Sequence, residues 1–495
     1  MSHSLQDSQT VSLSFEERLD ASPMTYAMWR LWMLSAGLIA LDGFDFFVIG
    51  VALPLIEQDF GLDPTTVGAI AVAAIAGSLV GSLTLGPLTD QIGRQQMLVI
   101  DIVLFLVASA TTALAWSVTA LIVFRFCVGV AIGADYPLSV AYITENVPAR
   151  LRGRLVIGAF TFQAVGALLG AVTGFIVLSI FRWQFPDSLA PAVHYAWRWM
   201  LGVGLVGAIA VAMLRFSFRL ESPRYYIARG EYKAAAAAAS LLLNQPIAID
   251  PDTEPQPPAT PLRYTALFSA QYIQRTILTS VPWFLQDIAT YGIGVFTPVI
   301  IAALAFSSQT DFIARQLASA KGSAFVDVFL IAGFLLAVIL VDRVGRILLQ
   351  MIGFIGMAFG LLLLSLSTYP STESSHFVRV FIGFIIFNLC MNLGPNSTTF
   401  LLSGEVFPTA IRASGAGFAA AFAKAGAVLG TFGLPILNQS LGTPILLQCL
   451  AIVCGLAAII TYLFRVETMG RSLESVDLVS PTPLPDPNSK NESSR

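Results

Sequence analysis

Long apolar stretches alternate with short polar ones along most of the chain. An α-helix needs about 20 predominantly apolar residues to cross the hydrocarbon core of a bilayer. Twelve stretches reach that length, and we expect spanning helices near 29–56, 65–87, 96–116, 118–142, 155–181, 197–216, 277–304, 323–341, 346–368, 377–400, 411–436 and 443–464. The pattern therefore predicts an all-α membrane protein with twelve transmembrane helices.

The polar segments divide the chain into five parts, namely 1–28, 29–216, 217–276, 277–464 and 465–495. In the central polar segment, "GEYKAAAAAASLLL" predicts a short helix at the membrane surface, and "NQPIAIDPDTEPQPPATPLRY" predicts an extended linker. The last part contains "SPTPLPDPNSKNESSR", which has too few apolar residues to fold. The second and fourth parts each hold six of the predicted helices.

Composition supports a membrane protein. The chain is 56% hydrophobic and only 12% charged, with a mean hydropathy of +0.76, whereas soluble domains are about 25% charged. The four cysteines all fall in apolar runs and show neither a disulfide framework nor metal-ligand spacing. We expect no cofactor, no metal and no nucleic-acid partner, and the N-terminus lacks the pattern of a signal peptide.

Basic residues of the loops predict how the chain is oriented. Loops on one side carry Arg94, Arg150, Arg152, Arg154, Arg215, Arg219, Arg224, Arg229, Lys233, Arg263, Arg275, Arg343, Arg346, Arg412, Arg465 and Arg471. Loops on the other side carry only Arg182, Arg198, Arg315, Lys321 and Arg379. The positive-inside rule then places both termini and the central loop in the cytoplasm of a plasma or cell inner membrane.

The two halves repeat one another in short motifs. "LTDQIGRQQ" after the second helix matches "LVDRVGRIL" after the eighth, and "TENVPARLRG" after the fourth matches "SGEVFPTAIRASG" after the tenth. "DFFVIG" in helix 1 also echoes "DIATYG" in helix 7. A duplicated six-helix unit predicts a substrate site at the midplane between the halves, with rocking of the halves as the transport motion.

These loop motifs resemble those of the major facilitator superfamily over nearly the whole chain. The resemblance implies a cytoplasmic gate made of Asp90, Arg94, Glu145, Arg152, Asp342, Arg346, Glu405 and Arg412. Ion pairs there either latch the two halves together or only anchor helix ends, and the sequence leaves both readings open. "GRQQ" also lacks the second basic residue that is usual in this loop.

One predicted span, helix 7, contains "WFLQDIATYG", in which Trp283, Asp287 and Tyr291 recur every four residues. That spacing puts all three on one helical face. The simpler interpretation is an Asp at a helix end near water. An ionisable residue at mid-bilayer costs about 2.5–3.5 kcal/mol even on the lenient insertion scale. The segment therefore favours a substrate site inside the membrane.

Other predicted spans carry ionisable or amide side chains too. Carboxylates and cations lie at Asp42, Asp45, Arg125, Asp135 and Lys424, and polar side chains lie at Tyr136, Gln163 and Asn396, the last after a Gly-Pro break. With Asp287, four carboxylates oppose two cations, so protons are expected to supply the missing positive charge. A structural role for Arg125 as the partner of Asp135 or Asp42 stays open. Close helix packing is expected at Gly129, Gly133, Gly166, Gly170, Gly417 and Gly426.

The donors in these spans fit an oxyanion. Trp283, Tyr291, Tyr136, Gln163 and Asn396 offer hydrogen bonds, and Lys424 offers a cation. An oxyanion that carries its own hydroxyls can donate to Asp287 while it accepts from the others. A neutral sugar would have less use for a buried Lys, and sugar sites usually hold more Gln and Asn.

Four segments resemble the phosphate:proton symporter family, namely "GADYPLSVAYITE", "PWFLQDIATYG", "GPNSTTFLLSGEVFPT" and the Lys in helix 11. The resemblance implies phosphate binding by Tyr136, Gln163, Trp283, Asp287, Tyr291 and Asn396. It implies proton movement by Asp42, Asp45, Arg125 and Asp135, with Lys424 in substrate coupling. "LDGFD" in helix 1 departs from that family and looks more like carriers of aromatic acids and metabolites.

The sequence therefore predicts a secondary active transporter, functional as a monomer, that imports inorganic phosphate by proton symport with alternating access. Two alternatives stay open: a proton-coupled carrier of an organic (aromatic) acid or sugar, and a nutrient receptor that no longer transports. No nucleophile–base pair or Gly-rich phosphate loop indicates an enzyme, and His3, His194 and His376 fall in tails or outer loops.

Overall fold

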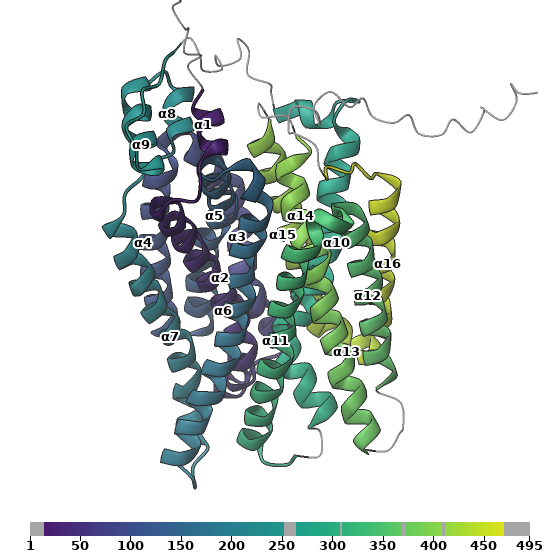
Figure 1. Cartoon of the computed structure of the whole chain (residues 1–495). Helices are drawn as coiled ribbons and strands as arrows, with labels where there is room; N and C mark the ends of the chain where they lie inside the picture. The colour runs from purple at the N-terminus through teal and green to yellow at the C-terminus, as the bar shows by residue number, and fades with distance from the viewer. Residues whose placement is uncertain (1–13, 252–263, 307–308, 368–372, 408–410, 470–495) are drawn as a thin grey trace, which may run out of the picture.

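The computed structural model describes residues 14–251, 264–306, 309–367, 373–407 and 411–469, and these ranges are helical with no strand among them. Twelve helical spans are long and apolar enough to cross a membrane, which confirms the predicted fold class. Figure 1 shows them standing side by side, with the earlier helices on one side of the molecule and the later ones on the other.

Six long helices come from the first half of the chain, in the order α2 (Tyr26–Phe60), α3 (Pro64–Ile92), α4 (Arg94–Ala113), α5 (Val118–Asn146), α6 (Ala149–Gln184) and α7 (Ala190–Ser217). The second half contributes α10 (Ile273–Ala305), α11 (Phe312–Val344), α12 (Arg346–Leu366), α13 (Glu373–Leu393), α14 (Pro395–Glu405), α15 (Arg412–Leu441) and α16 (Thr443–Leu463). The two groups meet mainly where α6 packs on α11 and α3 packs on α15.

The tenth predicted span is a pair of helices, α13 and α14, as the Gly-Pro break indicated. Gly394 separates them with φ −107° and ψ −102°, and Pro395 takes the first position of α14. Proline is well placed there because the first helical N–H has no intrahelical acceptor in any case. By contrast, α11 begins at Phe312, well before the predicted start near 323, because polar residues lower the hydropathy of its first turns.

Short helices gather at one end of the bundle, which we call the α9 end (Figure 1). They are α1 (Phe15–Ala21), α8 (Pro223–Ala228) and α9 (Tyr232–Leu243), with the 3-10 turn η1 (Tyr264–Phe268) in the second half. A helix forms at the predicted "GEYKAAAAAASLLL", and it is docked: Ala235, Ala239 and Leu242 are fully buried. Thr25 Oγ1, just before α2, donates to the carbonyl of Leu242 at 2.6 Å.

Small residues let α5 and α3 pack backbone to backbone. A Cβ added at Gly129 would collide with the carbonyl of Ala74, so the approach requires glycine. The expectation was wrong for Gly417, where a Cβ would meet nothing within 4 Å. Gly417 is a helix position of α15 that faces open space, and sequence alone does not tell such a position from a packed one.

The internal repeat extends to the residues that follow each half. Glu221 accepts hydrogen bonds from the N–H groups of Arg94 and Gln95 at the start of α4, at 3.2 and 2.9 Å. Glu467 does the same for Arg346 and Ile347 at the start of α12, both at 3.1 Å. These N–H groups have no partner inside their helices, so each carboxylate caps a helix and complements its dipole.

Candidate functional site

The three residues spaced along α10 share a buried face. Trp283, Asp287 and Tyr291 are each at most 4% exposed. Asp287 lies near the middle of the 33-residue helix and not at its end. The interpretation of Asp287 as a helix-end residue near water is therefore wrong. The face instead points toward α15 and the other half of the molecule.

Lys424 reaches this face from α15. Its Nζ lies 3.5 Å from Asp287 Oδ2 and donates to the Tyr291 hydroxyl at 2.7 Å. The ammonium also lies 4.3 Å from the ring centre of Tyr291 and 5.0 Å from that of Tyr136. Because Lys424 is only 4% exposed, a cation is held inside the membrane region where the two halves meet.

The first half contributes the other polar groups at this point. Tyr136 of α5 and Gln163 of α6 are 3% and 7% exposed, and Gln163 Nε2 donates to the Tyr136 hydroxyl at 2.6 Å. Tyr136 and Tyr291 interact through their hydroxyls, one from each half. The structure therefore brings together Tyr136, Gln163, Asp287, Tyr291 and Lys424, which the sequence proposed separately.

A layer of rings closes the site toward the α9 end. Phe400 of α14 stacks on Phe160 of α6 with ring centres 3.8 Å apart, and Phe160 stacks on Tyr136 at 5.8 Å. Trp283 packs edge-on against Phe400 at 4.6 Å. Trp283 thus belongs to this layer, which crosses from one half to the other. The sequence did not single out Phe160 or Phe400, because one Phe in an apolar run carries no signal.

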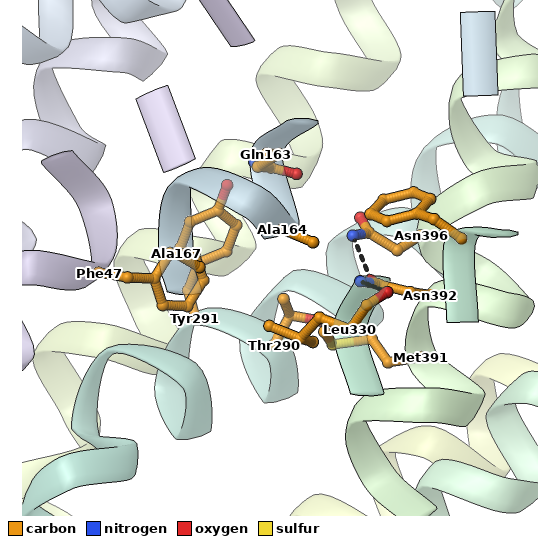
Figure 2. A pocket seen from close by; sticks show the side chains of 11 residues that line it. Phe47, Gln163, Ala164, Ala167, Thr290, Tyr291, Leu330, Met391, Asn392 and Asn396 are labelled. Carbon is orange, nitrogen blue, oxygen red and sulfur yellow. Dashed lines mark hydrogen bonds between the residues drawn. The ribbon is translucent and has the colours of Figure 1, made fainter. Parts of the chain in front are cut away.

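Amide side chains form a chain of hydrogen bonds in the second half. Gln286 Nε2 donates to Asn396 Oδ1 at 3.0 Å, and Asn396 Nδ2 donates to Asn392 Oδ1 at 2.7 Å. Asn392 in turn donates to the carbonyl of Leu330 at 2.9 Å. The sequence analysis found only Asn396, although Asn388, Asn392 and Asn396 recur every four residues. Figure 2 shows Asn392 and Asn396 facing a pocket with Tyr291 and Gln163 on its other side.

The pocket is small. It is lined by Phe47, Gln163, Ala164, Ala167, Thr290, Tyr291, Leu330, Phe334, Met391, Asn392 and Asn396. Its cavity volume is about 20 Å³, which is room for about one water molecule. A tetrahedral oxyanion is larger, so side chains of the two halves must separate before such a solute can enter.

A buried ion pair joins α5 to α2. Arg125 Nη2 lies 3.3 Å from Asp45 Oδ2 and also donates to the Asp45 carbonyl at 3.3 Å. Arg125 is fully buried and Asp45 is 8% exposed. The partner of Arg125 is therefore Asp45, and not Asp135 or Asp42, as the structural alternative supposed. Asp45 lies one turn beyond Asp42 on α2, which brings it level with Arg125.

Asp42 and Asp135 belong to a cluster of carboxylates inside the first half. Both are at most 1% exposed, and each interacts electrostatically with the other. A third carboxylate, Asp101 of α4, is fully buried and interacts with Asp135, and Arg215 of α7 interacts electrostatically with both. The sequence analysis missed Asp101, and it placed Arg215 in a loop, whereas Arg215 lies in the last turn of α7 and is 2% exposed. Asp101 in the apolar run "MLVIDIVLF" was the available signal.

The predicted gate residues pair within each half. Arg94 Nη2 lies 3.1 Å from Glu145 Oε1 in the first half. In the second half Arg346 makes two hydrogen bonds to Glu405, each 3.2 Å long, and lies 3.3 Å from Asp342. These pairs anchor helix ends to their own half. The side chains of Asp90 and Arg412 lie outside the described part of the structure.

Ion pairs between the halves occur at both ends of α6 and α11. Arg154 Nε lies 2.9 Å from Asp342 Oδ2 at the α9 end, and Arg182 Nη1 lies 2.7 Å from Asp311 Oδ2 at the far end. Arg152, two residues before Arg154, interacts electrostatically with Glu16 and Asp20 of α1. It also interacts electrostatically with Glu405 of the second half. Arg154 with Asp342 is thus an ion pair that links the two halves, and Arg154 was not among the predicted gate residues.

Comparison with known proteins shows the family of this chain. The family model described as "Sugar (and other) transporter" matches residues 32–479. Inorganic phosphate transporter 1-1 of Oryza sativa subsp. japonica is 30% identical over 432 residues, which cover 79% of this chain and 80% of that protein. A protein of Escherichia coli (strain K12) named for metabolite transport, YaaU, is 28% identical over 444 residues, with 90% and 93% covered.

Solved structures show the same fold. The proton:xylose symporter XylE, of the major facilitator superfamily, superposes with a TM-score of 0.70 at 19% identity, covering 91% of this chain and 98% of that one. The partially occluded inward-open form of XylE from E. coli gives 0.71, with 90% and 100% covered. At that identity the likeness concerns the fold alone.

Proposed function

The chain belongs to the Sugar (and other) transporter family of the major facilitator superfamily, and from this premise we propose that it imports inorganic phosphate together with protons. It is a transporter and not an enzyme. Relatives at about 30% identity are named inorganic phosphate transporters, which supports phosphate as the solute. The geometry of the site supplies the rest of the argument.

The observation that carries this proposal is the position of Lys424. The side chain is buried between Asp287 and Tyr291, with Tyr136 and Gln163 of the other half next to them. A cation buried in a membrane protein is costly and marks a functional site. A phosphate monoanion would accept hydrogen bonds from Lys424, Tyr136 and Gln163, and its own hydroxyls would donate to Asp287.

Protons account for the excess of buried carboxylates. Moving a monoanion into a negative cytoplasm costs about 2.3 kcal/mol per 100 mV. One proton per anion cancels that cost, and a second makes the potential a driving force. Asp42 interacts electrostatically with both Asp135 and Lys424. We assign Asp42, Asp45, Asp135 and the newly found Asp101 to proton movement, with Arg125 holding Asp45.

The proposal includes an orientation. The short helices and the Arg-rich loops lie together at the α9 end, and the positive-inside rule then makes that end cytoplasmic. Both termini and the segment 217–276 would face the cytoplasm of a plasma or cell inner membrane. Arg94, Glu145, Arg152, Asp342, Arg346 and Glu405 would form the cytoplasmic gate, with Arg154 as its link across the halves.

Uptake of labelled phosphate into proteoliposomes tests this function. We expect arsenate to compete with phosphate, and sulfate, benzoate and glucose to compete weakly or not at all. Asp287→Asn should lower uptake at least tenfold, because Asn accepts through one oxygen and cannot take a proton. Asp63→Asn is the matched control: Asp63 caps α3 by accepting from the N–H of Thr65 at 3.2 Å, and Asn caps equally well.

Each part of the proposal can fail separately. Full phosphate uptake by Asp287→Asn at normal expression would remove Asp287 from the site. Accumulation that survives a protonophore would remove the proton coupling and leave a uniporter or exchanger. Benzoate or glucose that competes better than arsenate would replace phosphate by an organic solute.

The organic solute is the second candidate because amide and apolar side chains gather at the pocket. Gln286, Asn392 and Asn396 form an amide network there, and Phe47, Leu330, Phe334 and Met391 supply apolar lining. Amides suit the hydroxyls of a polyol or hydroxy acid, and the apolar wall suits its carbon skeleton. The same competition assay decides between the two candidates.

A further inference from the structure

A carboxylate outside the site described above lies in the middle of α11. Asp327 is 7% exposed and belongs to the 33-residue span Phe312–Val344. Neither the loop motifs nor the intramembrane motifs of the sequence single it out. An ionisable residue at that depth costs about 2.5–3.5 kcal/mol on the insertion scale, so a function is its default explanation.

Asp327 stands alone among the described residues. Its carboxylate has no hydrogen-bond or ion-pair partner there, and no charged side chain acts on it. No charged side chain on the six helices packed against α11 interacts with Asp327. The described ones are Arg30, Asp42, Asp45, Glu57 and Asp59 (α2), Arg150, Arg152, Arg154 and Arg182 (α6), Arg275 and Asp287 (α10), Arg346 (α12), Arg379 (α13) and Glu405 (α14). In this respect Asp327 differs from Asp45 and Asp287, which face Arg125 and Lys424.

Asp327 lies on the face of α11 that lines the pocket. Leu330 and Phe334 line the pocket, and at about 100° per residue Asp327 falls within about 60° of both. It precedes Leu330 by one turn, which places it about 4.5 Å nearer the far end of the molecule. Asn388 and Asn392 hold this part of α11 against α13, since they donate to the carbonyls of Val326 and Leu330.

A file of polar side chains continues from Asp327 toward the far end. Ser323, Ser319 and Gln316 follow at helical spacing on the same face and are at most 4% exposed. Ser319 donates to the carbonyl of Pro298, while the Ser323 hydroxyl has no partner among the described residues. Beyond them lies Asp311, the N-cap of α11, which pairs with Arg182 of α6.

We propose that Asp327 is a second proton-binding site, reached from the extracellular side along this file, and that it carries one of two protons moved with each phosphate. The inference rests on the proposed function and adds a route and a stoichiometry to it. The carboxylates of the first half would carry the other proton. One isolated carboxylate, a free hydroxyl beside it and a polar file to the outside form a route that solvent water can complete.

The proton balance is simple. When α6 and α11 separate at the far end, a proton passes from external water to Asp327, with Ser323 able to accept and donate on the way. The site then closes with Asp327 neutral. When the α9 end opens, the pocket fills with cytoplasmic water and Asp327 releases the proton there. The carboxylate returns to its starting state, and one charge has crossed the membrane.

Reconstituted protein with a clamped membrane potential tests the stoichiometry. Proton influx and labelled phosphate uptake are measured together in wild type, Asp327→Asn and Asp327→Glu. We expect two protons per phosphate in wild type and in Asp327→Glu, and one in Asp327→Asn. Uptake of the monoanion with one proton is electroneutral, so Asp327→Asn should also lose the response to potential while it still binds phosphate. A purely structural role would lower the rate without changing either quantity.

A second measurement does not depend on the transported solute. Infrared titration of the purified proteins without solute should show one titrating carboxyl fewer in Asp327→Asn than in wild type. An unchanged proton-to-phosphate ratio, or equal numbers of titrating carboxyls, would overturn the inference and leave phosphate import standing. If wild type takes up no phosphate, the proposed function fails, and the infrared comparison still tests whether Asp327 binds a proton.

Discussion

At the scale of single residues, Lys424 shows how a buried cation is stabilised. Its ammonium contacts Asp287 at 3.5 Å and Tyr291 at 2.7 Å. Removing one partner of a buried pair typically costs about 3–5 kcal/mol, because the other charge is left uncompensated. We expect Lys424→Ala to abolish net uptake and to lower the thermal unfolding temperature, with a smaller loss of uptake in Lys424→Arg. The double variant with Asp287→Asn should recover the unfolding temperature but not uptake. Recovery of neither property would show that Lys424 acts through other contacts.

At the scale of helices, the caps of α4 and α12 depend on two glycines. Gly93 and Gly345 have φ values of 99° and 92°, and a Cβ there would come within 2.6 and 2.9 Å of Glu221 and Glu467 oxygens. Alanine would strain the backbone, at a cost of about 1–3 kcal/mol, and displace the capping carboxylate. We expect Gly345→Ala to lower the unfolding temperature and uptake, and Gly93→Ala to do the same. Gly417→Ala is the control, since open space and a helical backbone predict a change of at most about 1 kcal/mol in the stabilising direction. Equal behaviour of the three variants would contradict the capping role.

At the scale of the whole molecule, α6 and α11 are tied at both ends. Arg154 pairs with Asp342 at the α9 end and Arg182 pairs with Asp311 at the far end, which agrees with the small size of the pocket between the halves. The N–H of Ala314, together with Arg182, holds the pKa of Asp311 below its ordinary value, so this pair is ionised at neutral pH and is lost only as the pH falls toward strong acid. Exposed pairs contribute about 0.2–1 kcal/mol, so each should shift the open-to-closed ratio by at most about fivefold. We expect Asp311→Asn to widen spin-label distances at the far end and Asp342→Asn to widen them at the α9 end.

A charge swap is the control for the pair at the α9 end. Asp342 also lies 3.3 Å from Arg346, so Asp342→Asn removes two contacts. Arg154→Asp combined with Asp342→Arg restores only the contact between the halves and should return the distances to those of wild type. Distance distributions that do not change in any variant would show that other contacts hold the closed form.

The sequence by itself determined the spanning helices and several polar residues of the candidate site. A backbone in a bilayer must satisfy its hydrogen bonds internally, so twelve apolar runs of sufficient length could only be helices. The four-residue spacing of Trp283, Asp287 and Tyr291 predicted their common face, and the Gly394–Pro395 step predicted the break between α13 and α14. These are local properties, set by residue type and helical period.

Only the tertiary structure decided which residues meet. The partner of Arg125 is Asp45, the link between the halves is Arg154 with Asp342, and Asp101, Arg215 and the amide chain of Gln286 and Asn392 belong to the interior. Such contacts depend on the rotation and depth of each helix against its neighbours, which close packing at small residues sets. The mean hydropathy of an apolar run does not indicate how the helix is rotated about its axis. For the same reason, an isolated acid such as Asp327 becomes visible only when the face of α11 that carries it is known.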